Sequence, residues 1–298
     1  MVPLQAEAMD AVAVDPAHLA VLLGRNEERA VRIVSSRTGD STAEFPVAAG
    51  AEQLGYAGTQ SLLDSVAGPA GVVEIRSPAG AVTSTVKLGA PILALAGADE
   101  RHAFALVGGR SPRVVEIDLT SARVAGAVEP PAGTVSLAAH ASGPEASLVA
   151  GTRDGGIYLR LAGAPTWDRI AVDGNAPVFS LSGSAIYAFQ TVGDSKGVAV
   201  IQLPSQLQVR LFPVSLDARR MFSIDDGTLG IFEQSGKAAN VRLISCASPM
   251  LAVEARSKHS KFSFGDGQQW SLLGLATPDP DETQAPRPDS TGAAYAGC

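Results

Sequence analysis

Four histidines are the side chains of this sequence best suited to act as a general base or to bind a metal: His18, His102, His140 and His259. Two of them, His18 and His102, begin the similar stretches HLAVLLGRNEERAVRIV and HAFALVGGRSPRVVEID. Side chains at equivalent turns of a repeated fold are held far apart, so we do not expect these histidines to converge on one point. We therefore interpret all four as turn histidines, and we expect no metal site.

Other residue patterns that could support catalysis lack the context that they need. The sequence contains no G-x-S-x-G motif, and neither Cys246 nor Cys298 has a histidine partner in a recognisable pattern. No helix is expected after the glycine-rich stretch AGTRDGGIY, so we interpret it as a hairpin turn and not as a phosphate-binding loop. The prolines of DPDPDE, which carries Asp279, Asp281 and Glu282, favour a solvated linker over a calcium loop. We predict no catalytic residue and no cofactor.

The composition makes two classes of partner unexpected. The 298 residues are 46% hydrophobic and carry a net charge of −7, which is typical of a globular protein with a sizeable core. No cluster of Lys and Arg is interleaved with aromatic residues, so we expect no binding to nucleic acid. The longest apolar runs are well short of the roughly 18 residues that cross a membrane as a helix, so no membrane span is predicted.

The cysteines and the first residues leave the cellular compartment open. Cys246 and Cys298 allow at most one disulfide, and we favour two inert thiols. The start MVPLQAEAMDAVAV has neither the basic residues nor the continuous apolar segment of a signal peptide. We expect a cytoplasmic protein, or a periplasmic or cell-surface one if a leader has been removed.

A short hydrophobic pattern recurs along the chain at a step of 42 residues. Two apolar residues flank one variable residue at Val31/Ile33, Val73/Ile75, Val115/Ile117, Ile157/Leu159, Ala199/Ile201 and Val241/Leu243. This alternation is typical of a half-buried strand. Further strand-like stretches recur around it, giving about four short strands in each unit.

The repeat predicts an all-β fold, a seven-bladed β-propeller of four-stranded antiparallel blades. We expect one domain over residues 1–275, with blades starting near residues 9, 51, 91, 133, 175, 217 and 259. Residues 1–8 align with the outermost strand of a blade, so we expect them to complete blade seven and close the ring. Residues 276–298 form a Pro-rich acidic tail, which either returns to blade seven or is disordered.

Two stretches, HAFALVGGRSPRVVEIDLTSARVAGAVEPPAG and VVEIRSPAGAVTSTVKLGAP, resemble the YVTN-type propeller repeat. The similarity lies in the rhythm of strands and turns over residues 9–275, because the Tyr-Val-Thr-Asn tetrapeptide itself is absent. The resemblance implies a bacterial binding or scaffold module in an extracytoplasmic assembly. It also implies an alternative, a lactonase-like hydrolase or isomerase with its site at the mouth of the central channel.

The turns between the second and third strands should share one rim, and loops on a rigid scaffold commonly carry function. Arginine side chains pair well with carboxylates, so a mildly positive rim is suited to an acidic protein segment or an anionic glycan. We predict a non-catalytic protein-binding module whose candidate binding residues are Arg25, Arg110, Arg113, Arg153, Asp154, Lys196, Arg219, Arg220 and Lys237.

Overall fold

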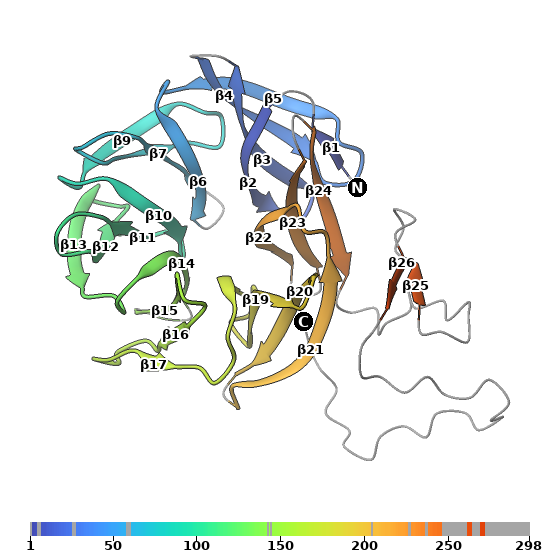
Figure 1. The fold of residues 1–298 in the computed structure, drawn as a ribbon. Coiled ribbons are helices and arrows are strands. Elements are labelled where there is room, and N and C mark those ends of the chain that lie inside the picture. Colours follow the sequence, from blue (N-terminus) through green and yellow to red (C-terminus); the bar gives the residue numbers. More distant parts are fainter. Residues whose placement is uncertain are drawn as a thin grey trace, which may run out of the picture.

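The structure is a computed structural model that describes residues 2–4, 7–25, 28–57, 61–141, 143, 145–203, 205–225, 228–235, 238–245, 261–263 and 269–271. Over these residues every regular element is a β-strand, and six four-stranded antiparallel blades form a closed ring (Figure 1). The protein is therefore an all-β, six-bladed propeller.

Blades one to five each use one stretch of chain, with the innermost strand first. The first three blades comprise β2 (Glu7–Asp15), β3 (His18–Arg25), β4 (Glu28–Ser35) and β5 (Ser41–Val47); β6 (Ala51–Ala57), β7 (Ser61–Val66), β8 (Val72–Arg76) and β9 (Val82–Lys87); and β10 (Ile92–Gly97), β11 (His102–Val107), β12 (Arg113–Asp118) and β13 (Arg123–Val128).

Blades four and five follow the same order, whereas blade six takes its fourth strand from the start of the chain. These blades comprise β14 (Thr134–Ala141), β15 (Ala146–Thr152), β16 (Ile157–Arg160) and β17 (Asp168–Arg169); β18 (Asn175–Phe179), β19 (Ala185–Val192), β20 (Ser195–Gln202) and β21 (Leu207–Val214); and β22 (Ala218–Asp225), β23 (Thr228–Ser235), β24 (Ala238–Ser245) and β1 (Val2–Leu4).

The hydrophobic core lies between the blades, so the second strand of a blade is buried on both faces. In β3, Leu19, Val21 and Leu23 pack towards Phe222 and Phe232 of blade six. The intervening residues of β3 point the other way: Ala20 and Leu22 pack towards Leu54 and Leu62 of blade two. Near-continuous apolar runs such as HLAVLLG follow from this two-sided burial, because both sets of alternate side chains meet a neighbouring blade.

The predicted seventh blade is wrong, and so is the predicted place of the first residues. In the pairing of β1 with β24, Val2 lies opposite Val241 and Leu4 lies opposite Ala239, so β1 completes blade six. The ring has no room for another blade, because β2 of blade one packs directly on β22 of blade six. As predicted, the first strand provides the outer edge of the blade that closes the ring, but that blade is blade six.

The region predicted as blade seven contributes two short strands. They are β25 (Lys261–Ser263) and β26 (Gln269–Ser271), which pair with each other and, among the described strands, form a separate two-stranded sheet. The predicted start of blade seven near residue 259 and the predicted tail at 276–298 lie outside the described residues, as do His259, Cys246 and Cys298.

A buried ionic cluster lies between blades one and two. Asp64 of β7 is fully buried, and its Oδ1 accepts a hydrogen bond of 2.7 Å from Nε of Arg76. Arg76 also donates to the carboxylate of Glu74 and to the carbonyl of Gly80. Burial raises the pKa of Asp64 to about 6, although the Arg76 guanidinium opposes the shift. The other carboxylate oxygen of Asp64 is buried without a hydrogen-bond partner among the described residues, which also disfavours its charge.

Candidate functional site

One face of the ring carries both the connections that enter the blades and the turns between second and third strands. We call it the entry face. Within a blade the two segments are bonded to each other: Gly108 N–H donates to the Pro91 carbonyl at 2.8 Å, and Arg153 N–H donates to the Gly133 carbonyl at 2.9 Å. The turns between second and third strands, which the sequence predicted to share one rim, therefore lie on the face of the ring where the innermost strands begin.

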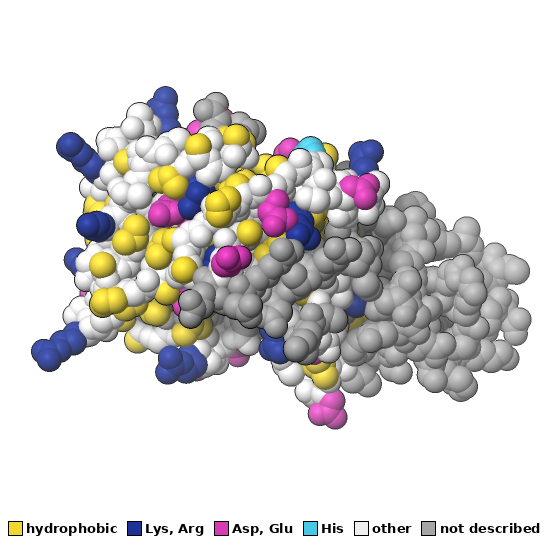
Figure 2. Space-filling model, turned by 90° about the horizontal axis from the view of Figure 1, so that it is seen from above, with side chains coloured by type: hydrophobic (Ala, Val, Ile, Leu, Met, Phe, Trp, Pro, Cys, Tyr) yellow, Lys and Arg dark blue, Asp and Glu magenta, His cyan; other side chains and the backbone are white. Residues whose placement is uncertain are grey.

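Three of the predicted arginines stand exposed on this face. Arg110 and Arg113 lie at the β11–β12 turn of blade three, and Arg153 lies in the β15–β16 turn of blade four. None of the three forms an ion pair or a side-chain hydrogen bond within the part of the chain that the structure describes. Figure 2 shows the ring from its edge, where several Lys and Arg side chains stand out with hydrophobic side chains between them.

The neighbouring Asp154 is already engaged within its own turn. Its carboxylate accepts a hydrogen bond from Oγ1 of Thr152. This hydrogen bond, with the backbone N–H groups of the turn, lowers the pKa of Asp154. Asp154 therefore shapes the turn that presents Arg153.

Lys196, another predicted binding residue, is held by contacts within the ring. Its Nζ lies 4.3 Å from the centroid of the Phe189 ring and donates a hydrogen bond of 2.5 Å to the carbonyl of Ala218. Partial burial, assisted by the charge of Arg219, lowers the pKa of Lys196. The lysine thus ties blade five to the entry of blade six and is less available to a partner than the exposed arginines are.

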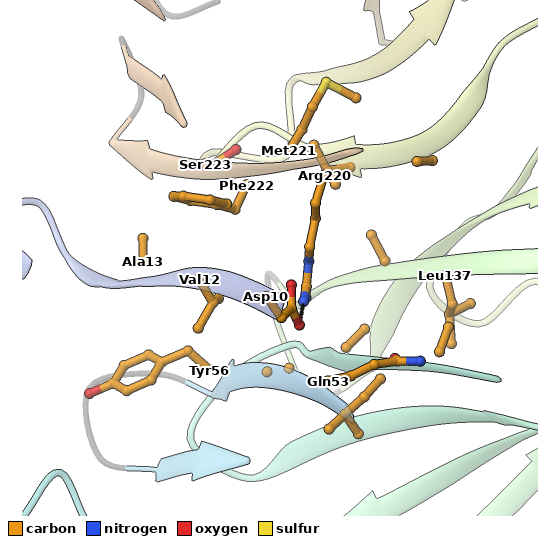
Figure 3. Close-up of a pocket in the computed structure, with 18 of the residues that line it drawn as sticks. Asp10, Val12, Ala13, Gln53, Tyr56, Leu137, Arg220, Met221, Phe222 and Ser223 are labelled. Atoms are coloured by element: carbon orange, nitrogen blue, oxygen red, sulfur yellow. Dashed lines mark hydrogen bonds and ion pairs between the residues drawn. The ribbon is translucent and has the colours of Figure 1, made fainter. Parts of the chain in front are cut away.

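The two arginines of β22 are consecutive in sequence but have different surroundings. Arg219 is exposed at the channel mouth, whereas Arg220 points from β22 to Asp10 of the adjacent innermost strand β2 (Figure 3). Nη2 of Arg220 also donates to the Leu54 carbonyl at 2.7 Å, and the Asp10 carboxylate accepts from the Leu54 N–H at 2.7 Å. We call these three residues the clasp, because they join blades six, one and two.

Two predicted binding residues cannot be placed as side chains. Arg25 is the last residue of β3, and its side chain lies outside the described part of the structure, as does the whole of Lys237. The entry face therefore carries Arg110 and Arg113 on blade three and Arg153 on the adjacent blade four, while Arg220 belongs to the clasp.

All six innermost strands are irregular near their first residues. Their pairing with the second strand shifts register between Ala8/Asp10, Ala51/Gln53, Ile92/Ala94, Thr134/Ser136, Asn175/Val178 and Ala218/Arg220. A bulge leaves a residue out of the ladder and redirects its side chain. The residues skipped in this way are Met9, Glu52, Leu93, Val135, Ala176 with Pro177, and Arg219, and we call them the mouth ring.

The mouth ring opens into a cavity of about 830 Å³ along the axis of the propeller. The cavity is lined from all six blades, and it extends from the mouth ring to residues at the far ends of the innermost strands, such as Asp15 and Ser180. Side chains around it include Val12, Tyr56, Leu137 and Phe222 (Figure 3). The channel wall is therefore largely apolar.

The histidines predicted as turn residues make local contacts. His18 and His102 repeat one motif, in which Nδ1 lies 2.9 Å from the carboxylate of an aspartate three residues earlier, Asp15 and Asp99 respectively. Partial burial acts to raise the pKa of each aspartate, but hydrogen bonds from the histidine and from backbone N–H groups outweigh it and lower the pKa. His140 lies at the end of β14 with its ring 5.8 Å from that of Phe179.

Sequence reasoning missed Asp10 and most of the mouth ring. Asp10 is 5% exposed and lies in the innermost strand of blade one, in the stretch AEAMDAVAV. A charged residue inside such an apolar strand was the available signal, because a buried carboxylate needs a partner. The bulges have a weaker signal, which is the small drift in spacing between successive innermost strands.

Among the described residues, no group of three or more His, Cys, Asp and Glu side chains gathers where it could hold a metal ion. No helix long and apolar enough to cross a membrane occurs in the same residues.

Comparison with known proteins supports the fold. No protein-family model and no curated protein matches this chain. Among solved structures, the hydrazine synthase of Kuenenia stuttgartiensis superposes with a TM-score of 0.57 at 11% identity, over 79% of this chain and 82% of that one. The β-propeller domain of Cps50 (Swd1) from Myceliophteria thermophila gives 0.57 and 11%, over 82% of this chain and 99% of that domain. At this identity the similarity is one of fold.

Proposed function

We propose that this protein is a non-catalytic binding module that docks an acidic segment of a partner protein on blades three and four of its entry face. The observation that carries the proposal is the group formed by Arg110, Arg113 and Arg153, which are exposed and unpaired among the described residues. Guanidinium groups bind carboxylates through paired hydrogen bonds, so unpaired arginines on a rigid face suit an acidic partner.

The rest of the chain makes these arginines distinctive. Its net charge is −7, so an acidic partner would be repelled by most of the molecule and attracted mainly where positive charge is unopposed. The propeller fold supplies the rigidity, since both turns are hydrogen-bonded to the connections beside them. A role within a bacterial extracytoplasmic assembly, and membership of the YVTN-type family, remain predictions from the sequence resemblance.

The test is quantitative capture of partners from the native organism by the full chain, by an R110A/R113A/R153A variant and by a control variant. The control is R37A/R123A, which removes exposed cations from the β4–β5 turn and from the start of β13, on the opposite face of the ring. We expect a partner that is captured by the wild type and the control, lost from the triple variant, and released as salt rises. If the triple variant captures the same partners as the wild type, the proposal is contradicted. If the wild type captures a glycan and no protein, the partner is a glycan and the proposed protein partner is wrong.

A further inference from the structure

The central channel has the size and lining of a small-molecule site. Its volume of about 830 Å³ falls within the range of roughly 300–1,000 Å³ that is typical of ligand pockets. Such pockets are mainly apolar, with a few polar groups that orient the ligand. The channel meets this description because six innermost strands contribute side chains such as Val12, Leu137 and Phe222.

Several polar side chains along the channel are occupied by neighbouring blades. Arg220 and Asp10 satisfy each other and Leu54 in the clasp. Gln53 donates to the Leu93 carbonyl at 3.0 Å, and Ser223 donates to the Phe179 carbonyl at 2.6 Å. An apolar chain that enters the channel would leave these hydrogen bonds intact.

The mouth ring carries the charges that remain available to a ligand. Arg219 and Glu52 are exposed there, and neither makes an ion pair or a side-chain hydrogen bond within the described chain. They come from blades six and two, on either side of blade one. The remaining members of the mouth ring are apolar, with Leu93 44% exposed and Val135 43% exposed.

Positive charge concentrates on the blade-six side of the mouth. Arg219 adjoins Ala218, whose carbonyl holds Nζ of Lys196, and Arg220 follows directly in β22. The charge of Arg219 contributes to the lowered pKa of Lys196, so the two positive charges lie close enough to repel each other. A negative group at this side gains from two cations, whereas Glu52 on blade two repels it.

We propose that the central channel binds an amphipathic carboxylate, with its apolar chain inside the channel and its carboxylate at Arg219. The apolar arc formed by Leu93, Val135 and Pro177 guides the chain past the mouth. This site is independent of the arginines proposed to dock a partner protein, which lie in the turns of blades three and four.

The test is calorimetric titration of the full chain with octanoate, decanoate and dodecanoate, below the concentration at which they form micelles. We expect one molecule bound per chain. Each added methylene should tighten binding about fourfold, because burial of one CH₂ changes the equilibrium by that factor. A dodecyl trimethylammonium ion should bind more weakly than dodecanoate.

Two variants at exposed positions of the mouth connect binding to this site. L93D should weaken the binding of dodecanoate at least tenfold, and R219E should make the protein bind the ammonium ion more tightly than dodecanoate. The matched controls are L207D and R123E, because Leu207 and Arg123 lie on the outermost strands β21 and β13 and are also exposed. Circular dichroism should show the same fold for all four variants.

Three results would overturn the assignment of the ligand to the channel. They are no binding of dodecanoate, an affinity that does not rise with chain length, and an affinity that L93D and R219E change no more than their controls do. Equal binding of the carboxylate and the ammonium ion by the wild type would also overturn the assignment of an anionic ligand.

Discussion

Loss of the clasp should weaken the whole ring, because Arg220 joins the last blade to the first two. In the variant R220M the Asp10 carboxylate, whose side chain is 7% exposed, keeps hydrogen bonds from the N–H groups of Ala11 and Leu54 among the described residues. Removal of one partner from a fully buried ion pair costs about 3–5 kcal/mol. The Arg220 side chain is 28% exposed, so water screens part of the interaction, and we expect a loss of about 2–3 kcal/mol.

A double-mutant cycle separates the ion pair from the packing of the arginine stem. The cycle uses R220M, D10N and R220M/D10N, because an asparagine at position 10 can still accept from the Leu54 N–H. Urea unfolding, followed by circular dichroism and by tryptophan fluorescence, gives the free energies where the two transitions coincide. We expect a coupling energy of about 1.5 kcal/mol or more between Arg220 and Asp10.

A second cycle on an exposed ion pair provides the control. Arg169 and Asp173 form an ion pair of 2.7 Å with side chains 55% and 71% exposed, and their coupling should be well under about 1 kcal/mol. If the coupling of Arg220 with Asp10 is no larger than that of the exposed pair, the clasp does not hold the ring together and the reasoning fails.

Two further predictions concern the packing between blades. The pKa of Asp64 is raised above its value in the unfolded chain, so the folded protein binds this proton more tightly and loses stability as pH rises from about 4 to about 6. A rise of the pKa from 3.8 to about 6 corresponds to about 3 kcal/mol of stability. Urea unfolding of wild type and D64N at each pH isolates this contribution as the difference between their free energies of unfolding. If the two free energies change in parallel with pH, Asp64 does not titrate in this window. A Cβ at Gly97 would lie 2.1 Å from the Tyr56 carbonyl oxygen, so G97A should lower the free energy of unfolding by at least about 2 kcal/mol. G143A, which has open space around it, should lower it by under about 0.5 kcal/mol. Similar urea midpoints for the two variants would refute the close approach of blades two and three.

The sequence predicted the four-stranded blades because their cause is local. The apolar pairs at a step of 42 residues, such as Val31/Ile33 and Val115/Ile117, lie in third strands, where they pack against a neighbouring blade. The number of blades depends instead on which blade packs against blade one and closes the ring. The packing of β2 on β22 is a contact between the first and the last blade of the ring, and no periodic pattern encodes it.

The candidate site was predictable to the same extent. Turn chemistry placed Arg110, Arg113 and Arg153 at the ends of strands, and there they are exposed. The engagement of Lys196 with Ala218 and of Arg220 with Asp10 depends on which blades adjoin, which is a property of the closed ring. The mouth ring depends on bulges, whose positions follow from pairing register and not from composition.

The central claim is that six blades close through the pairing of β1 with β24. It is tested most directly by oxidative crosslinking of paired cysteines in a C246S/C298S background. Leu4 lies opposite Ala239, so L4C/A239C should form a disulfide on mild oxidation, whereas L4C/F262C should not. A crosslink from position 4 to position 262, with none to position 239, would place the first strand on a seventh blade and contradict the account.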